Sequence, residues 1–434
     1  MKAIISNKIY MVVEPALHRA LEKELTYKVP SYNAPDQFTI IKNLKVINFN
    51  IAGGKMLVAF PVGRTDLIPK GYSVEDKRSY NHIEDFPKFQ FELRPSQKEI
   101  VYDMQDNCII NAKVGFGKTF CGLALAARLK EKTLVVTHTV ALRNQWEKEV
   151  VKTLGIKPGI IGSGKFNIDS PIVVSNIQSL VKYIPQLNRE FGLLIVDEMH
   201  HVSSPTFTKV VDAMFSRYKV GLSGTIERKD QKHVVFKDYF GSKIYRPERE
   251  NTMTPTVDVI NSGVAFSNTN ATWAEKVNAL KESYLYKNLV VRLADHYASL
   301  GHKVLIVSDR VEFLKECSEA SEYPSEVLIG ALKEDQREEV INKISSGEVK
   351  QLWSTQSLVS EGISINPLSC IILGTPLNNM PLLEQLIGRI QRQAEGKLDP
   401  VVVDIKLEGW TVNNQFNNRL GHYMKQGYEI NFIK

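Results

Sequence analysis

A glycine-rich loop stands between an apolar run and a helix-like stretch of the chain. The run Cys108–Ala112 leads into Gly115, Gly117, Lys118 and Thr119, and the helical sequence FCGLALAARLK follows. This strand, loop and helix context is the one that a phosphate-binding loop needs. Its glycines let backbone N–H groups approach phosphate oxygens, its lysine neutralises phosphate charge, and its threonine hydroxyl binds Mg²⁺. The sequence therefore predicts that these residues bind ATP and Mg²⁺, and that Lys118 is also catalytic.

The loop departs from the generic pattern in one place, because Ala112 stands where a first glycine is usual. Without its context, Gly-x-Gly-Lys-Thr is also compatible with a turn that caps a helix. The apolar strand before the loop and the helix after it favour phosphate binding.

Two adjacent acids are the second half of the predicted site. The apolar run Leu193–Val196 ends abruptly in Asp197 and Glu198. A carboxylate at such a strand tip can bind Mg²⁺ through water, and the next one can orient or deprotonate an attacking water. We therefore expect Asp197 to be a metal ligand and Glu198 the catalytic base. The alternative is a strand end in solvent whose acids have no role, and the preceding phosphate-binding loop makes it the weaker interpretation.

Two series of short apolar runs must position these residues. From residue 108 onward, CIINA, TLVVTH, IVVSN, LLIVDE and VGLSGT alternate with helical stretches, which is typical of a parallel α/β sheet. A second series, KVLIVS, SEVLIG, KQLWST, SCIILG and PVVVDI, follows a mixed polar passage that contains Pro247 and Pro255. Two sequential α/β domains joined by a linker are the simplest account.

The first 88 residues have a different pattern. A helix-like ALHRALEKEL precedes the strand-like FTIIKNLKVINF and KMLVAF, with turn signals at Gly53-Gly54 and at Pro69–Gly71. These features predict a small α+β module. It has 13 Lys and Arg against 9 Asp and Glu, so it carries +4 of the +7 net charge of the chain.

Composition excludes several classes of protein. With 434 residues, 43% hydrophobic and 24% charged, the chain suits about two to four folded domains rather than disorder. Cys108, Cys121, Cys317 and Cys370 form no C-x-x-C pair, so we expect reduced core cysteines and neither a zinc ribbon nor a disulfide framework. No uninterrupted apolar stretch of about 18 residues occurs, so neither membrane spanning nor export is expected. The net charge suits an acidic polymer as partner, but it also suits many enzymes.

With the phosphate-binding loop and the DEMH sequence at 197–200 in one α/β domain, residues 89 to 395 resemble superfamily 2 helicases. The resemblance implies two RecA-like parallel-sheet domains that use ATP and Mg²⁺ to move on nucleic acid. Arg94 and Gln97, in RPSQ, are similar to the segment that recognises adenine in this superfamily. Gln97 as a surface residue of a helix is a nearly equal alternative.

A further segment resembles the motif that links the nucleotide site to the nucleic acid. Gly221–Thr225 is similar to motif III, which implies coupling roles for Ser223 and Thr225 and a contact from His200 to this segment. A T-x-x-R-x-D continuation from Thr225 is similar to XPB-type and restriction-type translocases. A plain strand and turn, with a structural histidine, is the alternative.

The second domain resembles the superfamily at motif VI. The sequence QLIGRIQR from Gln385 to Arg392 has the pattern Q-x-x-G-R-x-x-R, which implies a nucleotide-binding role for Gln385. Arg389 and Arg392 lie three apart on a presumed helix, so that both guanidinium groups can point at one cleft and act as arginine fingers on the γ-phosphoryl group. A solvated basic helix face is the alternative.

A segment around Gly362 resembles motif V and implies a nucleotide contact at that glycine. Ser364 stands where the commonest pattern has Asp, which puts the contact at that position in doubt. The Gly-Ile-Ser-Ile form is similar to UvsW-type phage recombination helicases.

Polar residues at the carboxyl ends of the predicted strands are the candidate nucleic-acid contacts, because ligands gather at that edge of open α/β sheets. The segments resemble motifs Ia, Ib, IV and V, and their polar groups suit phosphate contacts that do not read sequence. The candidates are Thr137, His138, Ser175, Gln178, Ser308, Arg310 and Thr355. For any one of them, a helix cap is at least as good an interpretation. Trp146 is expected to pack against the sheet rather than to stack on a base.

Together these features predict an α/β protein of two tandem RecA-like parallel-sheet domains with a small N-terminal α+β accessory domain. The expected parts are a DNA substrate recognition domain at 1–88, an ATP-binding helicase domain at 89–248, a linker at 249–272 and a second helicase domain at 273–434. The expected function is unwinding or branch migration of branched or forked DNA, with a duplex DNA translocase or an RNA helicase as alternatives. We expect a cytoplasmic monomer, in the host cytoplasm if it is phage-encoded, with single-strand-binding or recombination proteins as candidate partners.

Overall fold

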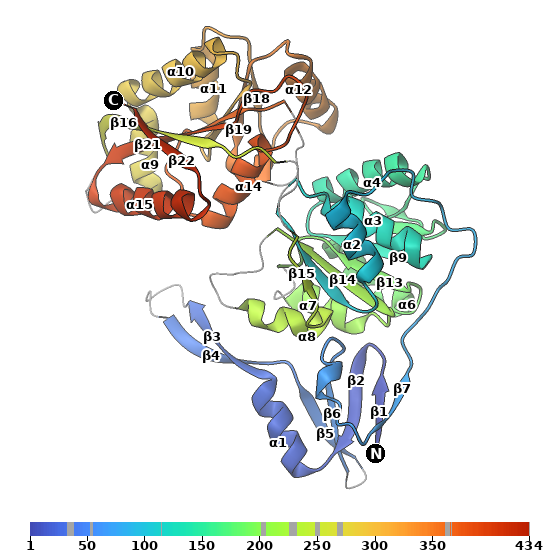
Figure 1. The fold of residues 1–434 in the computed structure, drawn as a ribbon. Coiled ribbons are helices and arrows are strands. Elements are labelled where there is room, and N and C mark those ends of the chain that lie inside the picture. The colour runs from blue at the N-terminus through green and yellow to red at the C-terminus, as the bar shows by residue number, and fades with distance from the viewer. Residues whose placement is uncertain are drawn as a thin grey trace. The chain divides into compact units, whose positions relative to one another are not determined.

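The computed structural model describes residues 1–32, 39–52, 55–113, 115–200, 205–224, 232–247, 252–266, 272–360, 365 and 367–433. The chain divides into two compact units, Met1–Glu248 and Arg249–Lys434. Each unit contains a large, mainly parallel sheet with buried apolar clusters on both of its faces. The elements of each unit can be followed in Figure 1.

The first large sheet has the strand order β11-β10-β12-β9-β13-β14-β8-β15. All its neighbouring strands are parallel except the short β11. In chain order the elements are α2 (Pro95–Asp103), β8 (Cys108–Asn111), α3 (Lys118–Leu129), β9 (Thr133–Thr137), α4 (Val140–Leu154), β10 (Gly159–Gly162), β11 (Lys165–Phe166), β12 (Ile172–Asn176), α5 (Ile177–Leu180), α6 (Ile184–Leu187), β13 (Leu193–Val196), α7 (Pro205–Ala213), β14 (Tyr218–Ser223), α8 (Phe236–Phe240) and β15 (Ile244–Tyr245). Strands β9, β12 and β13 are buried at every position, because helices cover both faces of a parallel sheet.

The N-terminal module forms a second, smaller sheet in the same unit. Its order is β5-β6-β2-β1-β7, and a separate ribbon pairs β3 with β4. The elements are β1 (Lys2–Ile5), β2 (Lys8–Val13), α1 (Pro15–Glu24), β3 (Thr26–Tyr32), β4 (Thr39–Lys45), β5 (Asn48–Ala52), β6 (Lys55–Pro61) and β7 (Ser73–Asp76). The predicted α+β character is confirmed, and β1, β2, β3 and β7 are strands beyond those predicted from the sequence.

The module is joined to helix α8 of the first unit through a buried ion pair. The Arg64 guanidinium donates to Asp238 Oδ1 at 3.1 Å, and the Tyr27 hydroxyl donates to the same oxygen at 3.0 Å. Asp238 is 0% exposed and Arg64 is 4% exposed. A Cβ at Gly63 would lie 2.5 Å from the Lys237 carbonyl oxygen, so the backbone here tolerates only glycine. The module therefore packs as part of the first unit.

The second unit has the strand order β18-β19-β17-β20-β21-β16-β22, and every neighbouring pair is parallel. Its elements are β16 (Thr256–Ala265), α9 (Trp273–Glu282), α10 (Tyr284–Ser299), β17 (Val304–Ser308), α11 (Val311–Glu319), β18 (Ser325–Leu328), α12 (Glu334–Ser346), β19 (Gln351–Thr355), α13 (Gln356–Ser360), β20 (Cys370–Leu373), α14 (Met380–Ile390), β21 (Val401–Glu408), α15 (Trp410–Lys425) and β22 (Glu429–Ile433).

One predicted boundary is wrong. Residues 249–272 were expected to be a linker, but β16 lies inside this range and pairs with both β21 and β22. Val257 and Val259 of β16 are buried in the core of the second unit. The strand was missed because its polar half, Asn261–Ala265, breaks the apolar run and contains a register shift.

The ten apolar runs predicted as strands are all strands of the two large sheets, β8, β9, β12, β13 and β14 in the first and β17 to β21 in the second. The four cysteines are buried and form no disulfide, as predicted. Within the described residues, the longest apolar helices are still too short or too polar to cross a membrane.

Candidate nucleotide and nucleic-acid site

The glycine-rich loop follows β8 and caps α3. Gly115 has φ 89° and Gly117 has φ 87°, so both occupy the left-handed region that favours glycine. Lys118 is the first residue of α3, and its Nζ donates to the Ala112 carbonyl at 2.9 Å. Its side chain therefore folds back over the loop, at the N-terminus of a helix whose backbone N–H groups can bind phosphate oxygens.

Arg94 and Gln97 hold this loop from the start of α2. Gln97 Nε2 donates to the Phe116 carbonyl at 2.8 Å, and its Oε1 accepts the backbone N–H of Arg94 at 3.0 Å. The Arg94 guanidinium donates to the same Phe116 carbonyl and lies over the Phe116 ring. Gln97 is 3% exposed, so its interpretation as a surface residue is wrong. Recognition of adenine by these two side chains stays a prediction.

The carboxylate of Asp197 is fixed by two hydrogen bonds directly after β13. Its Oδ2 accepts the indole N–H of Trp146 at 2.8 Å, and its Oδ1 accepts the backbone N–H of Glu198 at 3.0 Å. Trp146, on α4, is 1% exposed, which confirms the predicted packing. The bond to Asp197 was missed, although a buried indole N–H generally needs an acceptor.

The surroundings of Asp197 suit a divalent cation. The pKa of Asp197 is raised to about 6, first by burial and then by the neighbouring Glu198, against the lowering effects of Trp146 and Lys118. A buried carboxylate that is costly to ionise gains most from a nearby cation. The Thr119 hydroxyl and the Asp197 carboxylate are the hard oxygen donors that Mg²⁺ prefers, and Mg²⁺ in nucleotide sites usually takes few protein ligands.

Glu198 is linked to β14 through His200. It has φ 47°, an uncommon backbone conformation for a residue with a side chain. His200 Nδ1 lies 3.2 Å from Glu198 Oε2 and 3.1 Å from Ser223 Oγ. Ser223 ends β14 and is 0% exposed. His200 thus bridges the predicted base and the predicted coupling segment.

The arginines of the second unit do not share one helix. Gln385 and Arg389 lie on α14, but this helix ends at Ile390, so the presumed helical spacing of Arg389 and Arg392 is wrong. Beyond the helix, the Gln391 carbonyl accepts the N–H of Met253 at 2.9 Å, and Arg392 forms an isolated bridge with Thr252. Arg389 is 6% exposed.

Comparison with known proteins decides the family. Residues 90–228 match the family described as "Type III restriction enzyme, res subunit", and residues 281–394 match "Helicase conserved C-terminal domain". "Probable helicase D10" of Escherichia phage T5 is 42% identical over 438 residues, 99% of this chain and 95% of that protein. The chain belongs to the superfamily 2 helicases.

One further relative is similar in sequence, and one solved structure is similar in fold. "DNA 3'-5' translocase XPB2" of Sulfurisphaera tokodaii is 34% identical over 165 residues, 38% of this chain and 37% of that protein. The structure "S. cerevisiae Dbp5 bound to RNA and ADP BeF3" aligns with 79% of this chain and 94% of that one, at 15% identity and a TM-score of 0.54. The predicted fold of two RecA-like domains is confirmed, and the chain is an ATP-dependent helicase.

Three predicted nucleic-acid contacts of this helicase are buried hydroxyls with internal partners. Thr137 donates to the Thr139 carbonyl at 3.0 Å, Ser175 donates to the Ile161 carbonyl at 2.9 Å, and Ser308 accepts the Arg310 N–H at 3.1 Å. Each of the three hydroxyl residues is 0% exposed. Their hydroxyls are already satisfied within the strand ends, so a contact of these three residues with nucleic acid stays a prediction that depends on their backbone groups.

The other candidates are accessible. Gln178 is exposed, and His138, Arg310 and Thr355 are half-buried, all of them at or just after the carboxyl ends of β9, β12, β17 and β19. Arg310 pairs with Asp309 at 3.0 Å. Their contact with nucleic acid stays a prediction. Thr225, Gly362 and Ser364 lie outside the described residues.

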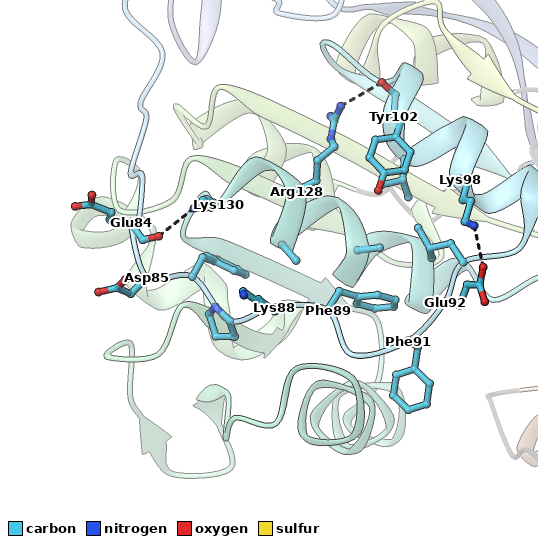
Figure 2. A pocket seen from close by; sticks show the side chains of 16 residues that line it. Glu84, Asp85, Lys88, Phe89, Phe91, Glu92, Lys98, Tyr102, Arg128 and Lys130 are labelled. Carbon is cyan, nitrogen blue, oxygen red and sulfur yellow. Dashed lines mark hydrogen bonds and ion pairs between the residues drawn. The ribbon is translucent and has the colours of Figure 1, made fainter.

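A cavity of about 850 Å³ lies in the first unit of the helicase (Figure 2). The segment before α2 and the helices α2 and α3 line it, with Phe89, Phe91, Lys98, Tyr102 and Arg128 among the lining residues. None of the predicted catalytic side chains lines this cavity. We therefore do not assign the cavity to the hydrolysis of ATP.

Proposed function

We propose that this helicase acts on branched or forked DNA, and that residues 1–88 select the branched substrate. ATP would be held by Lys118 and Thr119 in the first unit. Asp197 and Thr119 would hold Mg²⁺, which supplies positive charge to the phosphates, and Glu198 would accept a proton from the attacking water.

The proposed catalytic steps use groups that the first unit already orients. The Lys118 ammonium lies at the N-terminus of α3, where phosphate charge is stabilised. His200 contacts both Glu198 and Ser223, and we propose that it couples the predicted base to β14. In the second unit, we propose that Arg389 and Arg392 stabilise the negative charge that develops during phosphoryl transfer.

The observation that carries the DNA proposal is the basic module fixed to the ATP-binding domain. The module has a net charge of +4, from 13 basic and 9 acidic residues. The buried pair of Arg64 and Asp238 joins it to α8 of the first unit. A motor that grips phosphates is nearly indifferent to branching, whereas a third domain beside it can contact a second arm.

Two relatives bear on the alternatives. XPB2 is named as a DNA 3'-5' translocase, which favours DNA and keeps duplex translocation without unwinding as the alternative. A protein of Acanthamoeba polyphaga mimivirus, 27% identical over 370 residues, is named as a putative ATP-dependent RNA helicase. An RNA substrate is therefore the second alternative.

The test measures ATP hydrolysis with forked DNA, four-way junctions, linear duplex, single-stranded DNA and structured RNA at equal nucleotide concentration. We expect the strongest stimulation by forks and four-way junctions. Stimulation by RNA alone would replace the proposal with an RNA helicase. Equal stimulation by linear duplex, together with triplex displacement but no fork unwinding, would replace it with a translocase.

A further inference from the structure

Trp146 is the one side chain in the described part of the chain that donates a side-chain hydrogen bond to Asp197. The indole Nε1 lies 2.8 Å from Asp197 Oδ2. The tryptophan is 1% exposed and the carboxylate residue is 6% exposed, so water does not compete for this bond. In such surroundings a hydrogen bond to a charged acceptor is stronger than in water.

The indole ring has little freedom to move. A Cβ added at Gly122 of α3 would lie 3.1 Å from the Trp146 ring and 3.4 Å from the Ile195 side chain. The ring is therefore packed between the helix that begins with Lys118 and the strand that ends before Asp197. Glycine at position 122 provides the space that the ring fills.

Two donors fix the Asp197 carboxylate, one at each oxygen. Trp146 of α4 donates to Oδ2, and the backbone N–H of Glu198 donates to Oδ1. Each carboxylate oxygen can accept a further bond, so the group stays available to a cation or to its water. The indole N–H of a buried tryptophan needs a hydrogen-bond acceptor, and any backbone carbonyl could fill that need. The acceptor of Trp146 is instead the carboxylate of the proposed metal ligand.

We propose that Trp146 is a positioning residue, whose indole N–H orients the Asp197 carboxylate for Mg²⁺. The inference rests on the proposed magnesium role of Asp197. Groups that hydrogen-bond a metal ligand typically change metal affinity or activity by about 10- to 100-fold when they are removed.

The matched variants are Trp146→Phe and Trp353→Phe. Trp353 of β19 is 0% exposed, and its indole N–H donates to Gln351 Oε1 at 3.2 Å, in the other unit. Both changes remove a buried indole and its hydrogen bond, so general loss of packing should be similar. Thermal melting of both variants measures that loss.

The first measurement is the binding of fluorescent mant-ADP as Mg²⁺ is titrated, without nucleic acid. For Trp146→Phe we expect the half-maximal Mg²⁺ concentration to rise about tenfold, with unchanged mant-ADP binding in EDTA. Trp353→Phe should match the wild type. The wild-type Mg²⁺ dependence in Trp146→Phe would overturn the proposal, whereas failure of the wild-type protein to bind mant-ADP would overturn the proposed nucleotide site instead.

The second measurement follows the indole N–H signals by NMR in protein labelled with ¹⁵N at the tryptophan indoles. The chain has four tryptophans, and the variants assign the signals of Trp146 and Trp353. With ADP bound, addition of Mg²⁺ should move the Trp146 signal and leave that of Trp353 in place. A Trp146 signal that does not respond would overturn the proposal.

A third variant separates the hydrogen bond from the shape of the ring. Benzothienylalanine at position 146 keeps the ring size but has sulfur in place of the indole N–H. We expect this substitution to reproduce the raised Mg²⁺ requirement of Trp146→Phe at near-wild-type stability. Restoration of the wild-type Mg²⁺ requirement would show that ring packing alone matters and would contradict the proposal.

Discussion

At the scale of single residues, Glu198 has a backbone conformation that is unfavourable in free energy. Its φ of 47° is a left-handed conformation that Lys130 and Ser163 share among the described non-glycine residues. Such a conformation costs on the order of 1–3 kcal/mol and persists where the surroundings impose it. Here the neighbours are the Asp197 carboxylate, which accepts the Glu198 N–H, and His200. The two adjacent carboxylates have different partners, since Asp197 binds Trp146 and Glu198 contacts His200.

Glu198→Gln should bind ATP but hydrolyse it at least about 100-fold more slowly, because an amide cannot take a proton from water. Steady-state ATP hydrolysis and mant-ADP binding are the measurements. Glu282→Gln, an exposed acid on α9, is the matched control and should behave as the wild type. Normal turnover in Glu198→Gln would mean that another group is the base.

Arg389→Ala should lower kcat far more than nucleotide affinity, as expected of a group that acts mainly in the transition state. Arginine fingers contribute about 10³- to 10⁵-fold in other phosphoryl-transfer enzymes. Arg292→Ala, on the exposed face of α10, is the control. A decrease of less than about threefold would count against the assignment, since it would be far below this range.

At the scale of elements, the contact between the N-terminal module and α8 depends on one buried charge. Asp238 accepts hydrogen bonds from Arg64 and Tyr27, and burial raises the pKa of Asp238 to about 6. The folded protein therefore binds a proton at Asp238 more tightly than the unfolded chain does. Protonation of Asp238 stabilises the folded state at low pH, and this stabilisation is lost as pH rises through about 6.

Arg64→Ala should therefore lower the melting temperature more at pH 8 than at pH 5. At pH 8 an ionised Asp238 is left buried without its cation, which typically costs about 3–5 kcal/mol. At pH 5 the carboxyl is protonated and needs no cation. The double variant Arg64→Ala/Asp238→Asn should recover much of the loss at pH 8, and equal destabilisation at both pH values would contradict this account.

At the scale of the whole molecule, the proposed selection of branched DNA depends on the module's surface charge. Lys28 of β3 and Lys42 of β4 are exposed on the ribbon. Lys28→Glu/Lys42→Glu should keep ATP hydrolysis with saturating DNA, reduce the preference for forks over linear duplex, and show a shallower salt dependence of fork binding.

The control for charge is Lys152→Glu/Lys157→Glu. These exposed lysines lie at the end of α4 and in the loop before β10, away from the carboxyl edge of the sheet. This variant has the same change in net charge and should keep the preference for forks. If both double variants lose it equally, the effect is one of overall charge and the module has no particular part in substrate choice.

The sequence by itself determined ten strands of the two large sheets, the phosphate-binding loop and the order of the motifs. Buried parallel strands are mostly apolar, because helices cover both faces of the sheet, and this makes ten of them visible as short runs. The loop geometry needs positive φ angles before Lys118, and the glycines that adopt them can be recognised in the sequence. Local requirements of this kind can be read without knowledge of distant neighbours.

Only the tertiary structure decided which polar groups are available and which are already satisfied. Thr137, Ser175 and Ser308 have the right type and position for phosphate contacts, but neighbouring chain segments bury them. The partner of Asp197 is a tryptophan 51 positions away, and β16 joins a sheet whose other strands follow it in the chain. These outcomes depend on burial and on pairing between distant segments, and no local pattern of residues encodes them.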